Sequence, residues 1–246
     1  VGNFASDVRN FGQSKKQIAE LNKQIELLKT NQILDEDMIN QLNQLKNVLD
    51  LAGRGGYKVV AARVINRGST ATFKETVTID VGSQSGITKN MTVISESGLV
   101  GVVKSVTSNS SIVLLMSDPT FKVGVRIAGT QSIGVVSGQG GTSYLLQLLD
   151  ATGEIKVGDA LVARGSSGDR PFVPGVPVGL VVSVNSNASS ITQNADVESS
   201  ANLEKISIVA VVTAAAKGDP RDSLIPKPRP TATVYVTPTP TPSPSE

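Results

Sequence analysis

Short β-strand patterns fill about 150 residues of this chain, from 57 to 213, and they constrain its fold more than any other feature. Apolar and polar residues alternate at 76–81 and at 123–127. Gly, Ser or Asn separates the strands at spacings of roughly eight to twelve residues, and no helical pattern intervenes. This spacing favours an antiparallel barrel or sandwich over alternating strands and helices. We therefore predict a mainly β protein.

Two stretches of the β region resemble each other, which predicts two domains. Residues 101–112 and 179–191 both begin with a Gly-led apolar strand that continues into Ser-Val and then Ser-Asn, and a similar turn and strand precede each. We predict a first β-domain at 57–128, with 203–213 as a candidate to complete it, and a second at 129–202. The second domain carries an inserted loop at 164–174.

The N-terminal arm, residues 1–52, has a helical pattern with a coiled-coil period. Phe4, Phe11, Ile18 and Ile25 recur at every seventh position. Leu21 follows Ile18 by three places, and Leu28 follows Ile25 in the same way. One helix cannot bury such a seam alone, so we expect the arm to pair with a second copy of the chain.

The seam changes phase near its middle. Apolar residues restart at Met38 about three residues out of register, which indicates a stammer and two short coiled-coil pieces joined at 31–37. The alternative is an amphipathic helix that packs on its own domain, although no later segment has a complementary helical pattern. The predicted dimerisation residues are Phe11, Ile18, Leu21, Ile25, Leu28, Met38, Leu42, Leu45 and Leu49.

Glycine and proline mark the ends of the ordered regions. Gly53, Gly55 and Gly56 cannot continue a helix, so the arm should end there. Eight of the twelve prolines lie between Pro220 and Pro244. We therefore predict that residues 214–246 form an extended, disordered, Pro- and Thr-rich tail without packing contacts.

Composition excludes several classes of function. The chain contains no His and no Cys, which excludes thiolate nucleophiles, disulfides, Cys or His zinc sites and every His-dependent triad. Its net charge is only +2, its basic residues are scattered, and its eight aromatic residues form no basic cluster, so a nucleic-acid partner is not expected. Asp80, Asp118 and Asp159 each fall at a turn, where a structural role is favoured. No catalytic residue, metal or cofactor is predicted.

From about residue 10 to 213 the chain resembles the MreC family of rod-shape-determining proteins. The helix end Leu42-Asn-Gln-Leu-Lys-Asn-Val-Leu49, the strand Val60-Ala-Ala-Arg-Val-Ile65 and the turn region Val77-Thr-Ile-Asp-Val-Gly-Ser-Gln-Ser-Gly-Ile87 carry the resemblance. It continues through 91–93, 98–103, 111–118, 155–162, 174–179 and 203–212.

This resemblance implies an envelope protein with a short cytoplasmic start and one membrane span, both upstream of Val1. A dimerising coiled coil and two six-stranded β-barrels would follow outside the membrane, in the periplasm or on the outer face. It also implies a non-catalytic scaffold of the cell-elongation machinery, acting with MreD and MreB. That scaffold would determine cell shape by binding a peptidoglycan transpeptidase and activating peptidoglycan synthesis, and some members of the family form filaments.

Two other functions compete with the scaffold interpretation. A membrane-fusion adaptor of an efflux or secretion system also joins a coiled coil to small β-domains and carries a turn like Lys156-Val-Gly-Asp159, but it needs a helical hairpin between two half-domains. A sugar-processing enzyme would need paired carboxylates and aromatic platforms. Protease-like barrels would need a general base, and neither a His nor a Ser-x-x-Lys motif is present.

The partner-contact surface is the least constrained prediction. Phe172 and Val173 are apolar residues in the inserted loop at 164–174, and they are candidates for partner binding if they are exposed. The alternative role for both is to anchor that loop by packing against its own domain.

Overall fold

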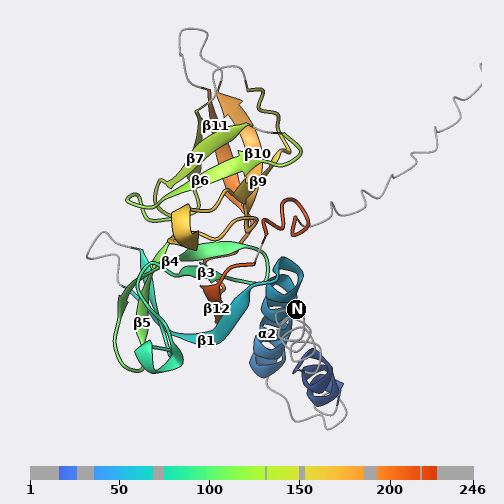
Figure 1. Ribbon diagram of the computed structural model, residues 1–246, viewed down its shortest axis with the longest axis vertical. Helices are drawn as coiled ribbons and strands as arrows, with labels where there is room; N and C mark the ends of the chain where they lie inside the picture. The colour runs from blue at the N-terminus through green and yellow to red at the C-terminus, as the bar shows by residue number, and fades with distance from the viewer. Residues whose placement is uncertain are drawn as a thin grey trace, which may run out of the picture.

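The computed structural model describes residues 17–26, 36–68, 75–130, 132–149, 153–185, 193–216 and 218–225. Its described strands form two closed antiparallel barrels, one above the other along the long axis, with helix α2 (Glu36–Gly55) beside the first (Figure 1). The predicted fold class, mainly β with two six-stranded barrels, is confirmed. Closure leaves neither sheet with a free edge strand.

The first barrel has the strand order β1-β12-β3-β4-β5-β2. Its strands are β1 (Lys58–Arg67), β2 (Thr76–Ile79), β3 (Thr92–Ile94), β4 (Leu99–Val106), β5 (Ser111–Leu115) and β12 (Ile208–Ala214), with the short 3₁₀ helix η2 (Ser83–Ser85) after β2. Alternation decides which side faces inward: Val77 and Ile79 are fully buried, and the threonines beside them are half-buried. Aliphatic side chains therefore fill this barrel.

The second barrel has the strand order β10-β11-β8-β7-β6-β9. Its strands are β6 (Lys122–Ile127), β7 (Ile133–Gly138), β8 (Tyr144–Leu148), β9 (Ala160–Ala163), β10 (Pro177–Asn185) and β11 (Asn194–Ser199), and η3 (Ser167–Asp169) lies in the inserted loop. Val123, Val125 and Ile127 point into the core, as the alternation at 123–127 predicts.

The chain crosses between the barrels earlier than the predicted boundary at 128/129. Strand β6 is the first strand of the second barrel and does not belong to the first. Strand β12 completes the first barrel after the second has formed its last strand. The pairings make β3-β4-β5 equivalent to β9-β10-β11, so the repeated sequences lie on corresponding strands, β4 and β10. The same equivalence matches β6 with β12, which explains why a linear division of the strand series misplaces β6.

The last turns of helix α2 pack on the first barrel. Val48, Leu51 and Ala52 are buried, and helix α2 contacts β1 and β12. The side-chain oxygen of Gln44 accepts hydrogen bonds from Ser207 N and Ile208 N, both at 3.1 Å. The helix ends at Gly55, followed by Gly56 in the left-handed conformation (φ 68°). The end of the helix thus packs on the barrel, although no later segment of the sequence has a complementary helical pattern.

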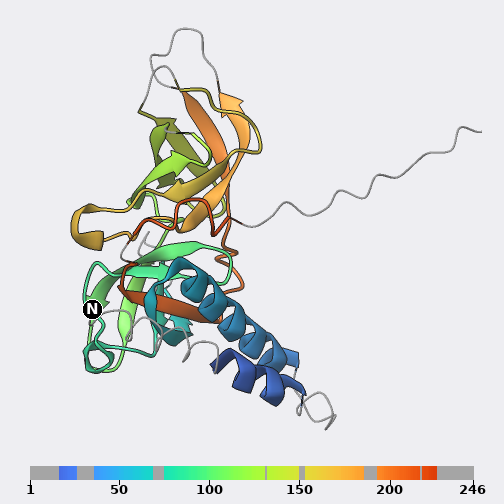
Figure 2. The same ribbon diagram turned by 45° about the vertical axis from the view of Figure 1, so that its right-hand side comes forward.

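A second helical segment covers residues 17–26. In both views it lies beside the N-terminal part of α2 (Figures 1 and 2), and its Ile25 is only 7% exposed. Residues 1–16 and 27–35 lie outside the described part of the chain. Among the described residues, no helix has both the length and the apolar character to span a bilayer.

The C-terminal region is not unpacked from residue 214 onward. Residues 218–225 lie against the second barrel, with Leu224 only 1% exposed and Asp222 paired with Arg126. The predicted absence of packing contacts is therefore wrong for this segment, because an apolar and an acidic side chain within the Pro-rich sequence both find partners. The rest of the predicted tail, residues 226–246, is outside the described residues.

Candidate functional site

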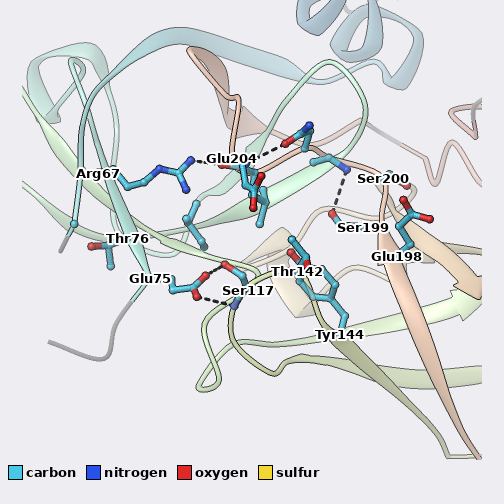
Figure 3. Close-up of a pocket in the computed structure, with 16 residues that line it drawn as sticks. Arg67, Glu75, Thr76, Ser117, Thr142, Tyr144, Glu198, Ser199, Ser200 and Glu204 are labelled. Carbon is cyan, nitrogen blue, oxygen red and sulfur yellow. Dashed lines mark hydrogen bonds between the residues drawn. The ribbon is translucent and has the colours of Figure 1, made fainter. Parts of the chain in front are cut away.

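A cleft of about 500 Å³ lies where the two barrels meet (Figure 3). It forms beside the two segments that carry the chain from one barrel to the other, after β5 and after β11. Arg67, Gly68, Glu75, Thr76, Leu115, Ser117, Gly141, Thr142, Tyr144 and residues 198–204 line it. Both barrels and both crossovers therefore contribute to one concave surface.

Glu75 joins three parts of this cleft. One of its carboxylate oxygens accepts a hydrogen bond from Gly141 N at 2.8 Å, and the other accepts one from the Ser117 hydroxyl. Its backbone N–H donates to Asp118 at 2.9 Å. Figure 3 shows the Glu75 and Ser117 side chains pointing toward one another. The start of β2 is thereby fixed to the β5–β6 crossover and to the β7–β8 turn of the other barrel.

The remaining charges make the cleft acidic. Glu198 and Glu204 are exposed at it, and the Arg67 guanidinium donates a hydrogen bond to Leu203 O. Burial raises the pKa of Tyr144 to about 12, with a further contribution from the Glu75 charge, so this phenol is neutral at physiological pH. Carboxylates and hydroxyls can bind a polar or cationic partner group here by hydrogen bonds and charge.

The turn aspartates have structural partners. Asp80 accepts a hydrogen bond from Arg63 N at 2.7 Å, and Asp159 accepts one from Lys156 N at 2.8 Å. Asp118, fully buried, accepts from the backbone N–H groups of Glu75 and Thr120. Within the described residues, no group of three or more carboxylates is placed to hold a metal ion.

A second set of contacts joins the barrels through the inserted loop. The buried Thr92 hydroxyl donates to Pro171 O at 2.8 Å and accepts from Val173 N at 3.1 Å. The Tyr57 hydroxyl donates to Pro174 O at 2.5 Å. These bonds tie strand β3 and the end of α2 to the loop that precedes β10.

Phe172 and Val173 are not exposed. Phe172 is 7% and Val173 is 2% exposed, and the Phe172 ring packs edge-on against Phe121 with the centroids 5.4 Å apart. Both side chains anchor the inserted loop in the barrel junction. They are candidates for partner contacts only if exposed, and that condition is not met. Partner binding at this loop would have to use its other residues.

The predicted dimerisation residues have unequal environments in one chain. Ile18 and Leu21 are half-buried and Ile25 is buried, whereas Met38 is 52% exposed. Leu42, Leu45 and Leu49 are half-buried, and Leu45 packs against the core of its own barrel. Phe11 and Leu28 lie outside the described residues. Pairing of the arm stays a prediction. Val48 and Leu51 are deeply buried, although the heptad pattern does not include them.

The sequence patterns also did not predict which residues lie where the two barrels meet. The amino-acid composition contains a weak indication of them. The chain has only eight aromatic residues, and the four described ones, Tyr57, Phe121, Tyr144 and Phe172, are all buried where the barrels meet. Large rings fill the irregular space between two domains better than Val or Leu can. Rare aromatics in an aliphatic chain could therefore have indicated the junction.

Comparison with known proteins identifies the family. Residues 64–213 match the family described as "Rod shape-determining protein MreC, barrel core". The cell shape-determining protein MreC of Streptococcus pneumoniae is 30% identical over 69% of this chain and 64% of its own length. That of Caulobacter vibrioides is 34% identical over 58% of this chain and 40% of its own length, so the chain spans less than two thirds of both relatives.

Solved structures agree with this match. A structure described as the major periplasmic domain from the cell shape-determining filament MreC shares 30% identity and a TM-score of 0.55, covering 63% of this chain and 95% of that one. The family profile extends over more than half of the chain and spans strands of both barrels. The chain therefore belongs to the MreC family of rod shape-determining proteins.

Proposed function

We propose that this protein is a non-catalytic scaffold of the bacterial cell-elongation machinery, which binds peptidoglycan synthases outside the membrane and activates them. Family membership supports a role in cell shape, because the relatives are named cell shape-determining proteins. The observation that carries the proposal is the cleft of about 500 Å³ between the two barrels. This cleft is a concave surface that a partner can bind. Hydrogen bonds between the two barrels hold its shape.

Activation requires only unequal binding. A scaffold that binds the active conformation of a synthase more tightly than the inactive one raises the population of the active form without any chemical step. The sequence lacks the His and Cys that most nucleophilic and acid–base mechanisms use. Glu75 at the cleft, and the buried Asp118 that accepts a hydrogen bond from its backbone N–H, are engaged in hydrogen bonds that hold the barrels together, which suits binding better than catalysis.

The assembly is part of the same proposal. We infer a homodimer that pairs through the arm and can extend into filaments, with MreD and a peptidoglycan transpeptidase as partners. A membrane span upstream of Val1 would anchor it with the barrels outside the membrane. The solved relative described as a periplasmic domain supports this placement.

Binding to the elongation transpeptidase of the same organism tests the partner. Charge reversal at the exposed cleft residues, Glu198→Lys with Glu204→Lys, should weaken binding at least tenfold in an immobilised-partner assay. Glu36→Lys with Glu154→Lys makes the matched control, because it reverses two charges at exposed carboxylates outside the cleft. Wild-type protein that binds efflux or secretion components and not the transpeptidase would contradict the scaffold.

Sedimentation equilibrium tests the dimer. The chain should be compared with one that begins at residue 36, because the later turns of α2 belong to the first barrel through Val48 and Leu51. The full chain should be dimeric. The shortened chain keeps the predicted contacts from Met38 to Leu49 but loses those from Phe11 to Leu28, so it should dimerise at least tenfold more weakly. Equal dimer dissociation constants for the two would show that residues 1–35 are not the pairing element.

A further inference from the structure

A short C-terminal segment runs from one barrel onto the other. We call residues 218–225 the strap. Strand β12 ends at Ala214 in the first barrel, Ala216 packs near Gly56 at the end of α2, and the strap then follows the second barrel (Figure 2). The family match ends at residue 213, so the strap lies beyond the shared barrel core.

The acidic side chain of the strap has two partners on the second barrel. One oxygen of Asp222 accepts a hydrogen bond from Arg126 Nη1 at 2.5 Å, and the other accepts one from Gly129 N at 3.0 Å. Arg126 lies on β6 with a side chain only 14% exposed, and Gly129 lies in the turn after it. Burial alone would raise the pKa of Asp222, but these hydrogen bonds, with the charges of Arg126 and Arg221, outweigh it and lower the pKa overall.

The apolar part of the strap is equally engaged. Leu224 is 1% exposed, and Pro220 packs directly on Gly175, whose φ of +85° and missing side chain permit the approach. A Cβ on Gly175 would lie 2.4 Å from Pro220 Cγ and 3.3 Å from the Tyr57 hydroxyl. The end of α2, the loop before β10 and the strap therefore meet at one point.

Local bonds fix the strap in its turn. Ser223 N and the Ser223 hydroxyl both donate to Pro220 O, at 3.2 and 2.7 Å. Asp219 accepts from Arg221 N at 2.8 Å, a bond within the strap itself. In this geometry Asp222 contacts the second barrel and Leu224 is buried, whereas Asp219 and Arg221 are exposed.

We propose that the strap is an interbarrel brace, which restricts the angle between the barrels through the Asp222–Arg126 pair and the burial of Leu224. The two crossovers after β5 and β11 hold the barrels on the side of the acidic cleft. The strap is a third passage of the chain from one barrel to the other, and it lies beside the inserted-loop contacts, where Tyr57 and Gly175 meet. Releasing it should let the second barrel move relative to the first while both barrels stay folded. This proposal does not depend on the scaffold function or on any partner.

Distance measurement between the barrels tests the brace. Because the chain has no cysteine, Gln84→Cys and Val157→Cys place one spin label on each barrel at exposed positions. We expect one narrow distance distribution in the otherwise unchanged chain. The double substitution Asp222→Asn with Leu224→Ala should at least double the width of that distribution, with an unchanged β-sheet circular dichroism spectrum. An unchanged width would overturn the proposal.

Asp219→Asn is the control with the same charge change, since Asp219 is exposed and the Asn side-chain oxygen can still accept the hydrogen bond from Arg221 N. A control distribution as broad as that of the double variant would also overturn the proposal, because a general charge effect would then explain both. Amide exchange gives an independent reading: Gly129 N–H should exchange at least tenfold faster in Asp222→Asn than in Asp219→Asn. Equal exchange in the two would show that the Asp222 contact does not hold the strap in solution.

Discussion

The Tyr57 hydroxyl donates a hydrogen bond of 2.5 Å to the carbonyl oxygen of Pro174, linking the segment between helix α2 and β1 to the inserted loop of the second barrel. Tyr57 is 6% exposed and lies next to the contact between Gly175 and Pro220. The anchored helix, the inserted loop and the strap are thus connected through one side chain.

Tyr57→Phe should lower the free energy of unfolding by about 1 kcal/mol, because it removes one buried hydrogen bond and leaves the Pro174 carbonyl without that donor. Urea unfolding followed by circular dichroism measures the change. Tyr235→Phe, in the tail beyond the described residues, is the control with the same chemical change. Equal stabilities of Tyr57→Phe and wild type would mean that the bond contributes nothing to holding the barrels.

The same residue predicts the response to alkaline pH. Burial, with the nearby charge of Asp219, raises the pKa of Tyr57 above its ordinary value of about 10. The folded state therefore keeps a proton that the unfolded state releases, so stability is full below pH ~10 and falls as the pH rises further. Urea unfolding between pH 8 and 11 should show this fall. Tyr57→Phe should reduce the slope without abolishing it, since the pKa of Tyr144 is also raised; an identical slope would contradict the burial of Tyr57.

Thr92→Val should destabilise the protein by about 1–3 kcal/mol, although the two side chains have nearly the same shape. The variant leaves Pro171 O without its hydroxyl donor and Val173 N without its acceptor. Thr92→Ser retains the hydroxyl and should be clearly more stable than Thr92→Val. Thermal unfolding of the three proteins provides the comparison, and a valine variant as stable as the serine variant would exclude a role for these bonds.

Substitutions near the end of helix α2 should lower the free energy of unfolding of the first barrel, whereas substitutions near its start should not. Leu51→Ala removes a side chain that is 2% exposed and should cost about 2–5 kcal/mol. Met38→Ala changes a residue that is 52% exposed and should stay within about 0.5 kcal/mol for the single chain. Denaturant unfolding at a protein concentration below any dimerisation separates the two effects. Similar costs at both positions would contradict the docking of the helix end.

Local patterns predicted the strands but not what they join. Alternation at 76–81 and 123–127 places Val77, Ile79, Val123 and Val125 inside barrels because a strand buries every second residue. Which barrel a strand completes depends on pairing across the whole chain, so a division of the strands in sequence order places β6 in the wrong barrel. The equivalence of β6 and β12 appears only when the closed sheets are compared.

In the arm and at the junction, too, local sequence patterns do not predict contacts between side chains that are far apart in the chain. A search for a 3.5-residue period selects Leu42, Leu45 and Leu49, and it passes over Val48, whose partner is a barrel formed later in the chain. The high proline content around Asp222 predicts an unpacked segment. Its partner Arg126 is 96 positions away in the sequence, so no local pattern indicates the contact. Glu75, directly before β2, and Gly141, in the turn between β7 and β8, are 66 positions apart. Only the folded topology brings such residues together.

Cross-linking of peptidoglycan precursors by the elongation transpeptidase, measured with and without this protein on the same membranes, tests the scaffold function most directly. A scaffold should raise the initial rate in a saturable manner and should form no cross-linked product when the transpeptidase is absent. An unchanged rate at saturating protein, or product formed by the protein alone, would contradict it.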